Sequence, residues 1–157
     1  MQSKKSRNIS GWINFNKSKG ITSAKAVSKI KKFLNVNKVG HAGTLDPMAT
    51  GVLPIAIGEA TKTVSYFMEG EKTYKCIASW GNETATDDAE GEIISTSNIR
   101  PSMEQINNLL NDFKGIISQK PPNYSAIKIN GKRAYKIARS GGVPSLVTRK
   151  VKVLDFK

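Results

Sequence analysis

The pattern of apolar and polar residues predicts a chain of short strands and helices. Residues 12–16, Trp-Ile-Asn-Phe-Asn, predict a short strand. In residues 22–34 the apolar positions recur at helical spacing, which predicts a helix. Thr22 or Ser23 can cap this helix by accepting a backbone N–H. The apolar positions of the predicted helix are Ala24, Val27, Ile30 and Leu34. A strand followed by an amphipathic helix therefore opens the predicted fold.

The middle of the chain continues this alternation of element types. Residues 52–57 form an apolar run typical of a buried strand, in which Pro54 favours a place near a sheet edge or at a bulge. A short helix is predicted over residues 59–68, and strands are predicted over residues 73–80 and 93–94.

The last third begins with a capping box. Ser102 and Gln105 have its spacing, so a helix is expected to follow and to end at Gly115. Its inward positions are predicted to be Ile106, Leu109, Leu110 and Phe113. The elements predicted after it are a strand at 124–129, a turn at 130–131, a short helix at 132–139 and a strand at 151–156. Because the order lacks βαβ regularity, we expect an α+β fold with a mixed or antiparallel sheet and flanking helices.

Length and composition limit the kind of protein. A chain of 157 residues is sufficient for one domain with a hydrophobic core, which we place at residues 11–157 after a basic flexible tail at residues 1–10. No apolar run of membrane-spanning length and no signal peptide is found, so a membrane is not an expected partner. The single cysteine, Cys76, cannot form an internal disulfide, which fits the cytoplasm, and its alternating neighbours favour a structural strand residue.

The net charge of +13 is distributed unevenly along the chain. Residues 1–45 contain ten Lys or Arg and no acid, and residues 113–154 again contain ten bases and no acid. Residues 46–112 hold eleven acids and four bases. Two basic blocks around an acidic middle favour a nucleic-acid surface, with solvated lysines as the alternative. The first predicted helix also carries a basic ridge that could follow phosphates or be merely solvated, at Lys25, Lys29 and Lys32.

The segment from Gly40 to Gly51 carries the candidate chemistry. Asp46 is the first acidic residue of the chain, and the proline after it disfavours helical backbone at this position. Glycines at positions 40, 43 and 51 permit tight turns. We therefore expect a stiff loop that holds one carboxylate, although an Asp-Pro pair in an ordinary turn is the alternative that spacing alone leaves open.

This segment also carries a family resemblance. Residues Lys38–Pro54 resemble the signature of the TruB family of tRNA pseudouridine synthases. Further segments resemble family motifs in the expected order: Lys17–Ser23, Gly58–Lys62, Lys72–Tyr74, Thr86–Gly91, Pro121–Lys128, Gly131 and Ala134–Arg139. The resemblance runs from about residue 11 to the end and implies a catalytic domain that isomerises the T-loop uridine of tRNA, at tRNA position 55. It implies no cofactor and no metal, and one histidine with one cysteine makes a zinc site of the usual type implausible.

The resemblance also assigns roles to individual residues. Asp46 matches the catalytic aspartate, which either attacks the sugar as a nucleophile or removes a C2′ proton to form a glycal; the sequence leaves both routes open. Tyr74 matches a tyrosine that stacks on the flipped base, with a core tyrosine as the alternative. His41 matches a residue that lies against the RNA beside that base. Lys17 matches a lysine of the early loop that is more plausibly structural than catalytic. Candidate phosphate contacts are Lys128, Lys132, Arg133 and Arg139, each of which could equally be ordinary surface charge.

The chain also departs from the family pattern. Ser18 replaces a usual proline and Asn16 an acid, which affects the stiffness of the early loop. A later family strand resembling Lys-Gly-x-Tyr-Ile-Arg, whose arginine pairs with the catalytic aspartate, is not found in the 157 residues, nor is a C-terminal RNA-binding module. We therefore expect the N-terminal portion of such a synthase, feeble or inactive by itself.

The expected protein is a cytoplasmic, cofactor-free and monomeric enzyme whose partner is the T-stem-loop of tRNA. A non-catalytic RNA-binding fragment or RNA chaperone is the alternative from another functional class. An NTP-binding enzyme is disfavoured, because the glycine-rich segment lacks the Gly-Lys-Ser/Thr ending that cradles phosphates.

Overall fold

The computed structural model describes residues 6–157, which fall into two compact units, residues 6–74 and residues 75–157. The first unit contains, over its described residues, β1 (Gly11–Lys17), α1 (Ser23–Leu34), β2 (Val39–His41), β3 (Gly51–Ile57), the 3-10 helix η1 (Gly58–Thr63) and α2 (Val64–Glu69). The second contains β4 (Asn82–Thr84), β5 (Ile93–Thr96), α3 (Met103–Leu110), the 3-10 helix η2 (Asn111–Phe113), β6 (Gly115–Gln119), β7 (Lys128–Ile129), β8 (Lys132–Arg133), α4 (Ala134–Arg139) and β9 (Arg149–Val153). All strand pairs within residues 6–157 are antiparallel, which confirms the predicted α+β class.

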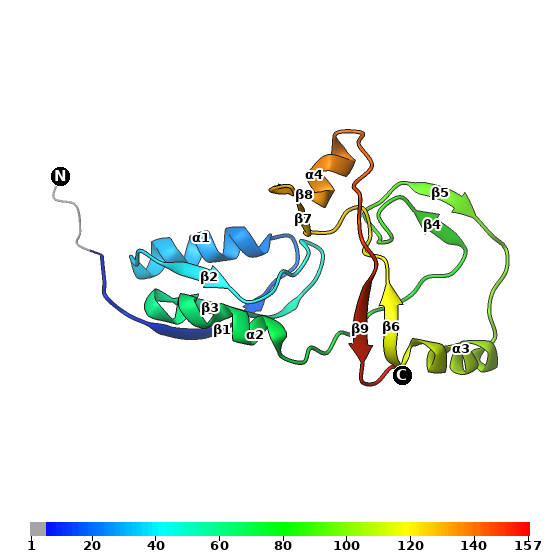
Figure 1. Cartoon of the computed structure of the whole chain (residues 1–157), viewed down its shortest axis with the longest axis horizontal. Helices are drawn as coiled ribbons and strands as arrows, with labels where there is room; N and C mark the ends of the chain where they lie inside the picture. The colour runs from blue at the N-terminus through cyan, green and yellow to red at the C-terminus, as the bar shows by residue number, and fades with distance from the viewer. Residues whose placement is uncertain (1–5) are drawn as a thin grey trace. The chain divides into compact units, whose positions relative to one another are not determined.

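The first unit is a three-stranded sheet covered on one face by α1 (Figure 1). The strand order is β1-β3-β2, so β3 is central. Alternation along β1 turns Ile13 and Phe15 toward α1 and leaves Asn14 and Asn16 exposed on the other face. The core between the sheet and α1 is formed by Ala26, Leu53 and Ile55, with Ile13, Phe15, Ile21, Val27, Ile30, Val39 and Leu45 packed around them.

Pro54 lies in the central strand, which corrects the prediction of a sheet edge or bulge. It pairs with Asn14 of β1, and its carbonyl accepts the N–H of Ala42 at 2.9 Å on the β2 side. In an antiparallel ladder the N–H and C=O of one residue point to the same neighbour, so the N–H that proline lacks would also face the β2 side. β2 ends at His41, one residue before Ala42. Pro54 is therefore tolerated, because β2 has ended before Ala42, the residue opposite Pro54 to which a backbone N–H would have donated.

Helix α1 is capped at its start by Thr22, one of the two predicted caps, and at its end by Asn35. The side chain of Thr22 accepts the N–H of Lys25 at 3.1 Å, and Asn35 adopts the left-handed conformation after the last turn, with φ of 53°. Ser23 and Ala26 are buried in this helix, whereas Ala24 is exposed despite its predicted inward position. Thr22 is thus the cap, and this leaves the hydroxyl of Ser23 free for another partner.

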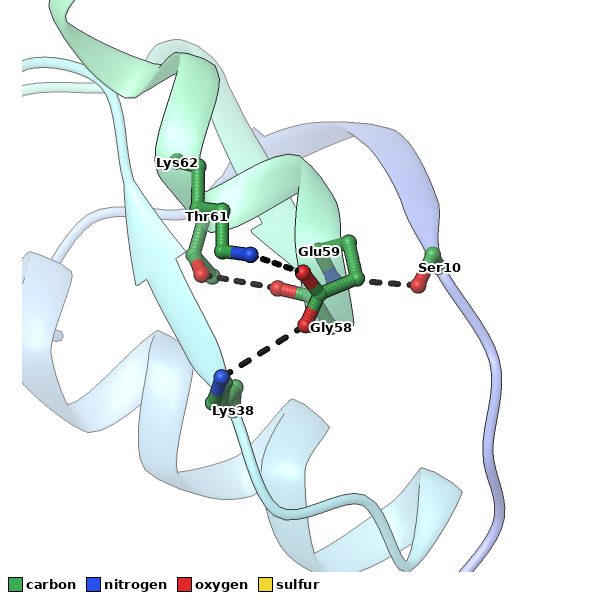
Figure 2. Close-up of polar contacts among 6 residues, drawn as sticks. All are labelled: Ser10, Lys38, Gly58, Glu59, Thr61 and Lys62. Carbon is green, nitrogen blue, oxygen red and sulfur yellow. Dashed lines mark hydrogen bonds and ion pairs between the residues drawn. The ribbon is translucent and has the colours of Figure 1, made fainter.

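The segment before β1 is tied to the first unit. The N–H of Arg7 donates to the carbonyl of Asn35 at 2.8 Å, and the hydroxyl of Ser10 accepts the N–H of Glu59 at 3.0 Å (Figure 2). Gly58, which precedes Glu59, has φ of 58°, and a Cβ atom there would lie 2.4 Å from the carbonyl oxygen of Ile9. Of the predicted tail, residues 1–5 lie outside the described residues and residues 6–10 make these contacts.

The second unit buries much less apolar surface than the first. Ala134, Pro121 and Pro144 are its only buried residues. The capping box is confirmed, because Ser102 and Gln105 bond each other's backbone N–H groups at 2.8 and 3.2 Å. Two residues predicted to point inward from this helix, Leu109 and Phe113, are exposed instead. Most side chains of this unit therefore lie against solvent rather than in a core.

Other predictions differ in extent from the structure. Residues 73–80 form no strand, and Cys76 is exposed there, which corrects its reading as a structural strand residue. The strand predicted over 124–129 is reduced to β7, and the helix predicted over 132–139 is divided between β8 and α4. β2, β4 and β6 are not predicted from the sequence. None of the helices in the described part of the chain has both the length and the apolar composition that crossing a bilayer requires.

Candidate active site

The loop between β2 and β3 carries Asp46. Residues 42–50 leave the sheet after His41 and return at Gly51, which pairs with Lys17 of β1. The N–H of Ala42 donates to the carbonyl of Pro54 at 2.9 Å and closes the base of the loop. Asp46 therefore lies on a short loop that is held at both ends by β3, through Pro54 at its start and Gly51 at its end.

Ser23 fixes the residue before Asp46. Its hydroxyl donates to the carbonyl of Leu45 at 3.0 Å and accepts the N–H of Leu45 at 3.0 Å. The side chain of Leu45 packs against the core cluster beneath α1. The first turn of α1 thus holds the backbone N–H and carbonyl of Leu45, and the core holds its side chain.

Lys17 and Gly20 fix the residue after Asp46. The N–H of Gly20 donates to the carbonyl of Pro47 at 2.8 Å. Lys17 is fully buried, and its Nζ donates to the carbonyls of Ile21 at 2.9 Å, Ser18 at 3.2 Å and Pro47 at 3.4 Å. A buried ammonium is tolerated when acceptors replace its water shell, and here three carbonyls do so. Lys17 consequently ties the early loop to the loop of Asp46.

Asp46 itself is exposed. Its carbonyl accepts the N–H of Ala49 at 3.1 Å, which forms a turn after the carboxylate. Within residues 6–157 the carboxylate makes no hydrogen bond and no ion pair. The structure thus combines a backbone pinned on both sides with a carboxylate free to meet an incoming ligand. A charged group on such a fixed loop can be presented to a substrate in one orientation.

His41 lies at the start of the same loop and is half-buried. Its Nδ1 is hydrogen-bonded to the carbonyl of Gly43. Because a carbonyl can only accept, Nδ1 carries a proton in this contact, and Nε2 is the ring nitrogen left for another partner. The ring is therefore fixed to the loop with one nitrogen available to another molecule.

The other predicted site residues have different settings. Tyr74 is the last residue of the first unit, lies outside any helix or strand and is 72% exposed, so the alternative of a core tyrosine is wrong. Lys128 on β7 and Arg139 on α4 are exposed residues of the second unit. Arg139 lies over the ring of Tyr135, with Cζ 5.7 Å from the ring centroid. Their contacts with RNA, and that of Lys17, stay predictions. Among residues 6–157, no group of three or more His, Cys, Asp or Glu could hold a metal ion.

Two residues that position the loop were not predicted. The sequence predicts Ser23 as a possible helix cap, and it places Ser23 and Gly20 in the Lys17–Ser23 segment without a role in holding the loop. Gly20 has φ of 88°, a conformation that glycine adopts without strain, and this directs its N–H to Pro47. The sequence offered one usable signal: with two adjacent hydroxyl residues at a helix start, one caps and the other is free to bond elsewhere.

Comparison with known proteins identifies the family. Residues 31–157 match the model of the TruB family pseudouridylate synthase (N terminal domain). The chain is 55% identical over 150 residues to tRNA pseudouridine synthase B of Brucella canis, covering 96% of this chain and 46% of that protein. It is 56% identical over 154 residues to tRNA pseudouridine synthase B of Bartonella tribocorum, covering 98% and 48%. The chain thus spans about half the length of these curated relatives.

A solved structure shares the fold. In a crystal structure of a Cbf5-Nop10-Gar1 complex, one chain superimposes with a TM-score of 0.54 and 27% sequence identity, over 94% of this chain and 36% of that one. The family model matches most of the chain and the curated relatives match nearly all of it, in agreement with the resemblance that the loop of Asp46 carries. The chain belongs to the TruB family of pseudouridylate synthases.

Proposed function

We propose that the protein carrying this chain isomerises uridine to pseudouridine in the T-loop of tRNA, at tRNA position 55, with Asp46 as the catalytic carboxylate. The observation that carries the proposal is the exposed carboxylate of Asp46 between two pinned neighbours, Leu45 and Pro47, in a member of this family. The names of the curated relatives support tRNA as the substrate.

The reaction needs one carboxylate. The N1–C1′ bond of uridine breaks, the uracil turns, and C5 joins C1′ with loss of the C5 proton, so no redox partner takes part. In one route Asp46 attacks C1′ and displaces the uracil as an anion; in the other it takes the C2′ proton and leaves a glycal. In both, a loop that fixes the carboxylate reduces the entropy lost in reaching the reactive geometry.

The remaining predicted residues have proposed roles of their own. The uridine has to leave its stack to reach Asp46, and an exposed Tyr74 is available as a stacking surface for it. Nε2 of His41 is available to a hydroxyl of the RNA. Lys128 and Arg139 of the second unit supply positive charge for phosphates, and Lys17 acts from beneath the loop.

The sequence also motivates proposals on the enzyme's location, oligomeric state, RNA partner and cofactor requirement. We infer a cytoplasmic monomer that binds the T-stem-loop of tRNA and works without a cofactor or a metal. Affinity dominated by phosphates predicts a log–log salt slope of about −0.7 per phosphate contacted, if the RNA is engaged as a single strand. A salt-independent affinity would contradict the assignment of the basic blocks to RNA.

The first experiment measures tritium release from a tRNA transcript labelled at uridine C5. The wild-type chain is compared with Asp46→Asn and with Asp112→Asn, which removes another exposed carboxylate in the second unit. The Brucella canis relative serves as the positive control. We expect Asp46→Asn to abolish release while tRNA affinity is nearly unchanged, and Asp112→Asn to behave as wild type. Where the wild-type chain releases tritium above background, release by Asp46→Asn at the same rate would refute the assignment.

A second function is favoured by one observation. Among the described residues no cation pairs with Asp46, and a catalytic carboxylate benefits from such a partner to remain ionised and oriented. A non-catalytic RNA-binding fragment is therefore the alternative, in which neither the chain nor Asp46→Asn forms product while both bind tRNA. Robust turnover by residues 1–157 alone would eliminate this alternative and the expectation of a feeble chain.

A further inference from the structure

Helix α1 presents three lysines on the face opposite the core. Lys25, Lys29 and Lys32 follow one another at intervals of four and three residues, which places them on one side of a helix. All three are exposed, whereas Ser23 and Ala26 on the other side are buried against the sheet. We call these three lysines the α1 ridge. The ridge is a line of positive charge along the outer surface of the first unit.

The ridge is not neutralised by neighbouring acids. None of its lysines forms an ion pair within residues 6–157, and α1 contains no acidic residue. Other lysines of the same unit differ in this respect. Lys38 and Lys62 each form an ion pair with a different carboxylate oxygen of Glu59 (Figure 2). The first unit therefore contains a paired and an unpaired set of exposed lysines.

The positions of the ridge lysines are also electrostatically unfavourable for helix α1. Lys25 occupies the third helical position, where the partial positive charge of the helix N-terminus disfavours a cation. Lysines separated by three or four residues repel each other in addition. In α3, the same third position holds Gln105, which completes a capping box, and Glu104 stands beside it. A local arrangement that costs stability without an intramolecular partner is expected where function requires it.

The ridge starts at the turn that holds the candidate active site. Ser23, two residues before Lys25, bonds both backbone groups of Leu45, the neighbour of Asp46. From Lys25 to Lys32 the helix rises about 10 Å at roughly 1.5 Å per residue. Three cations spread over this length can face more than one phosphate of a single RNA strand. The line of charge thus has the length and the sign to follow a nucleic-acid backbone near Asp46.

We infer that the α1 ridge binds consecutive phosphates of the RNA whose uridine is presented to Asp46. This inference rests on the proposed function and adds an RNA-binding surface to it. The ridge contacts the backbone and reads no base, so it contributes affinity and orientation in a sequence-independent way.

The test compares two double variants with equal loss of charge. Lys25→Gln/Lys29→Gln removes two ridge cations, and Lys38→Gln/Lys62→Gln removes two cations that are paired with Glu59. Binding of an unmodified tRNA transcript is measured over a range of salt concentrations for the wild-type chain and both variants. We expect the log–log salt slope of the ridge variant to become less steep by about 1.4 to 1.8, and that of the control to stay as in wild type. Circular dichroism checks that α1 is intact, since glutamine is a good helix former.

Several outcomes would overturn the inference. Equal changes of the salt slope in both variants would show that tRNA binding depends only on overall charge. Absence of tRNA binding by the wild-type chain at low salt would show that the α1 ridge does not bind this RNA. Loss of binding to phosphatidylserine vesicles, with tRNA binding unchanged, would assign the ridge to a membrane surface instead. Failure of the proposed function is read separately, because Asp46→Asn is assayed for product and retains the ridge.

Discussion

The hydroxyl of Ser23 holds both the N–H and the carbonyl of Leu45, each at 3.0 Å. Leu45 belongs to no strand, so this hydroxyl supplies the hydrogen bonds that a neighbouring strand would supply in a sheet. Because Leu45 directly precedes Asp46, the first turn of α1 determines where the carboxylate-bearing backbone begins. A helix that shows no chemistry of its own thereby becomes part of the site.

Replacing Ser23 with alanine should loosen this connection. Ser23→Ala leaves two part-buried backbone groups of Leu45 without a partner, which costs about 1–3 kcal/mol of unfolding free energy. Urea unfolding measures the loss, and product formation at a temperature where the fold is intact should fall as well. Ser28→Ala is the control, because Ser28 is exposed on the same helix. Equal stability of the two variants would contradict the role of Ser23.

Replacing Lys17 with methionine tests the buried ammonium. Methionine is similar in size but donates no hydrogen bond, so the carbonyls of Ser18 and Ile21 lose their bond to Nζ. We expect a loss of about 1–3 kcal/mol in unfolding free energy, measured by urea titration. Lys19→Met, at an exposed position two residues later, should change stability little. A Lys17→Met variant as stable as wild type would show that the desolvation of the ammonium offsets its three hydrogen bonds.

Replacing Lys25 with glutamate should stabilise the fold. A carboxylate in the first turn of α1 interacts favourably with the helix N-terminus and lies four residues before Lys29, so about 0.3–1 kcal/mol is expected. Thermal unfolding at low ionic strength measures this gain. The same variant should bind tRNA more weakly than wild type, which would show opposite effects on stability and binding. A lower unfolding temperature for Lys25→Glu would show that a lysine at this position does not destabilise the N-terminus of α1.

The ion pairs of Glu59 predict a weak dependence of stability on pH. The hydrogen bond and the charge of Lys62, followed by the charge of Lys38, lower the pKa of Glu59 below its ordinary value of 4.5. The resulting stabilisation is present above pH 4.5 and is lost as pH falls through the lowered pKa of the folded state. The unfolding free energies of wild type and Glu59→Gln should therefore converge in acid. Glu83→Gln, at an exposed and unpaired position of β4, is the control, and convergence should be less visible at high salt.

The sequence predicts the first unit better than the second. β1, α1, β3 and the helical segment after β3 have strong periodicity and clear caps, and each was predicted close to its observed bounds. Periodicity is informative there because α1 and the sheet bury one face each. In the second unit few side chains are buried, so the alternation of residues 73–80 corresponds to no strand. β6, which pairs with β9 more than thirty residues later, depends on a partner that local pattern does not reveal.

The candidate site shows the same division. The carboxylate of Asp46, its proline and the glycines near it are visible in the sequence, as is the histidine at the loop's start. The residues that hold the loop, Ser23 and Gly20, lie more than twenty positions earlier in the chain. Their role follows from β1 and β3 pairing in the register that places Lys17 opposite Gly51, which is a tertiary property. The sequence therefore identifies the candidate carboxylate and the structural lysine Lys17, but not Ser23 and Gly20 as residues that position the loop.

The four fixed points of the loop, at Ala42, Leu45, Pro47 and Gly51, make its length as important as its composition. Only one residue, Asp46, separates the second point from the third. An insertion there would displace the carboxylate by about 3.4 Å, the advance of one extended residue, and a misplacement of about 1 Å can already cost a hundredfold in rate. These anchors are backbone groups, so a substitution leaves them in place, whereas a change in the number of residues would release one of them. Natural variation in this segment should consequently consist of substitutions, with insertions and deletions confined to loops that lack such anchors.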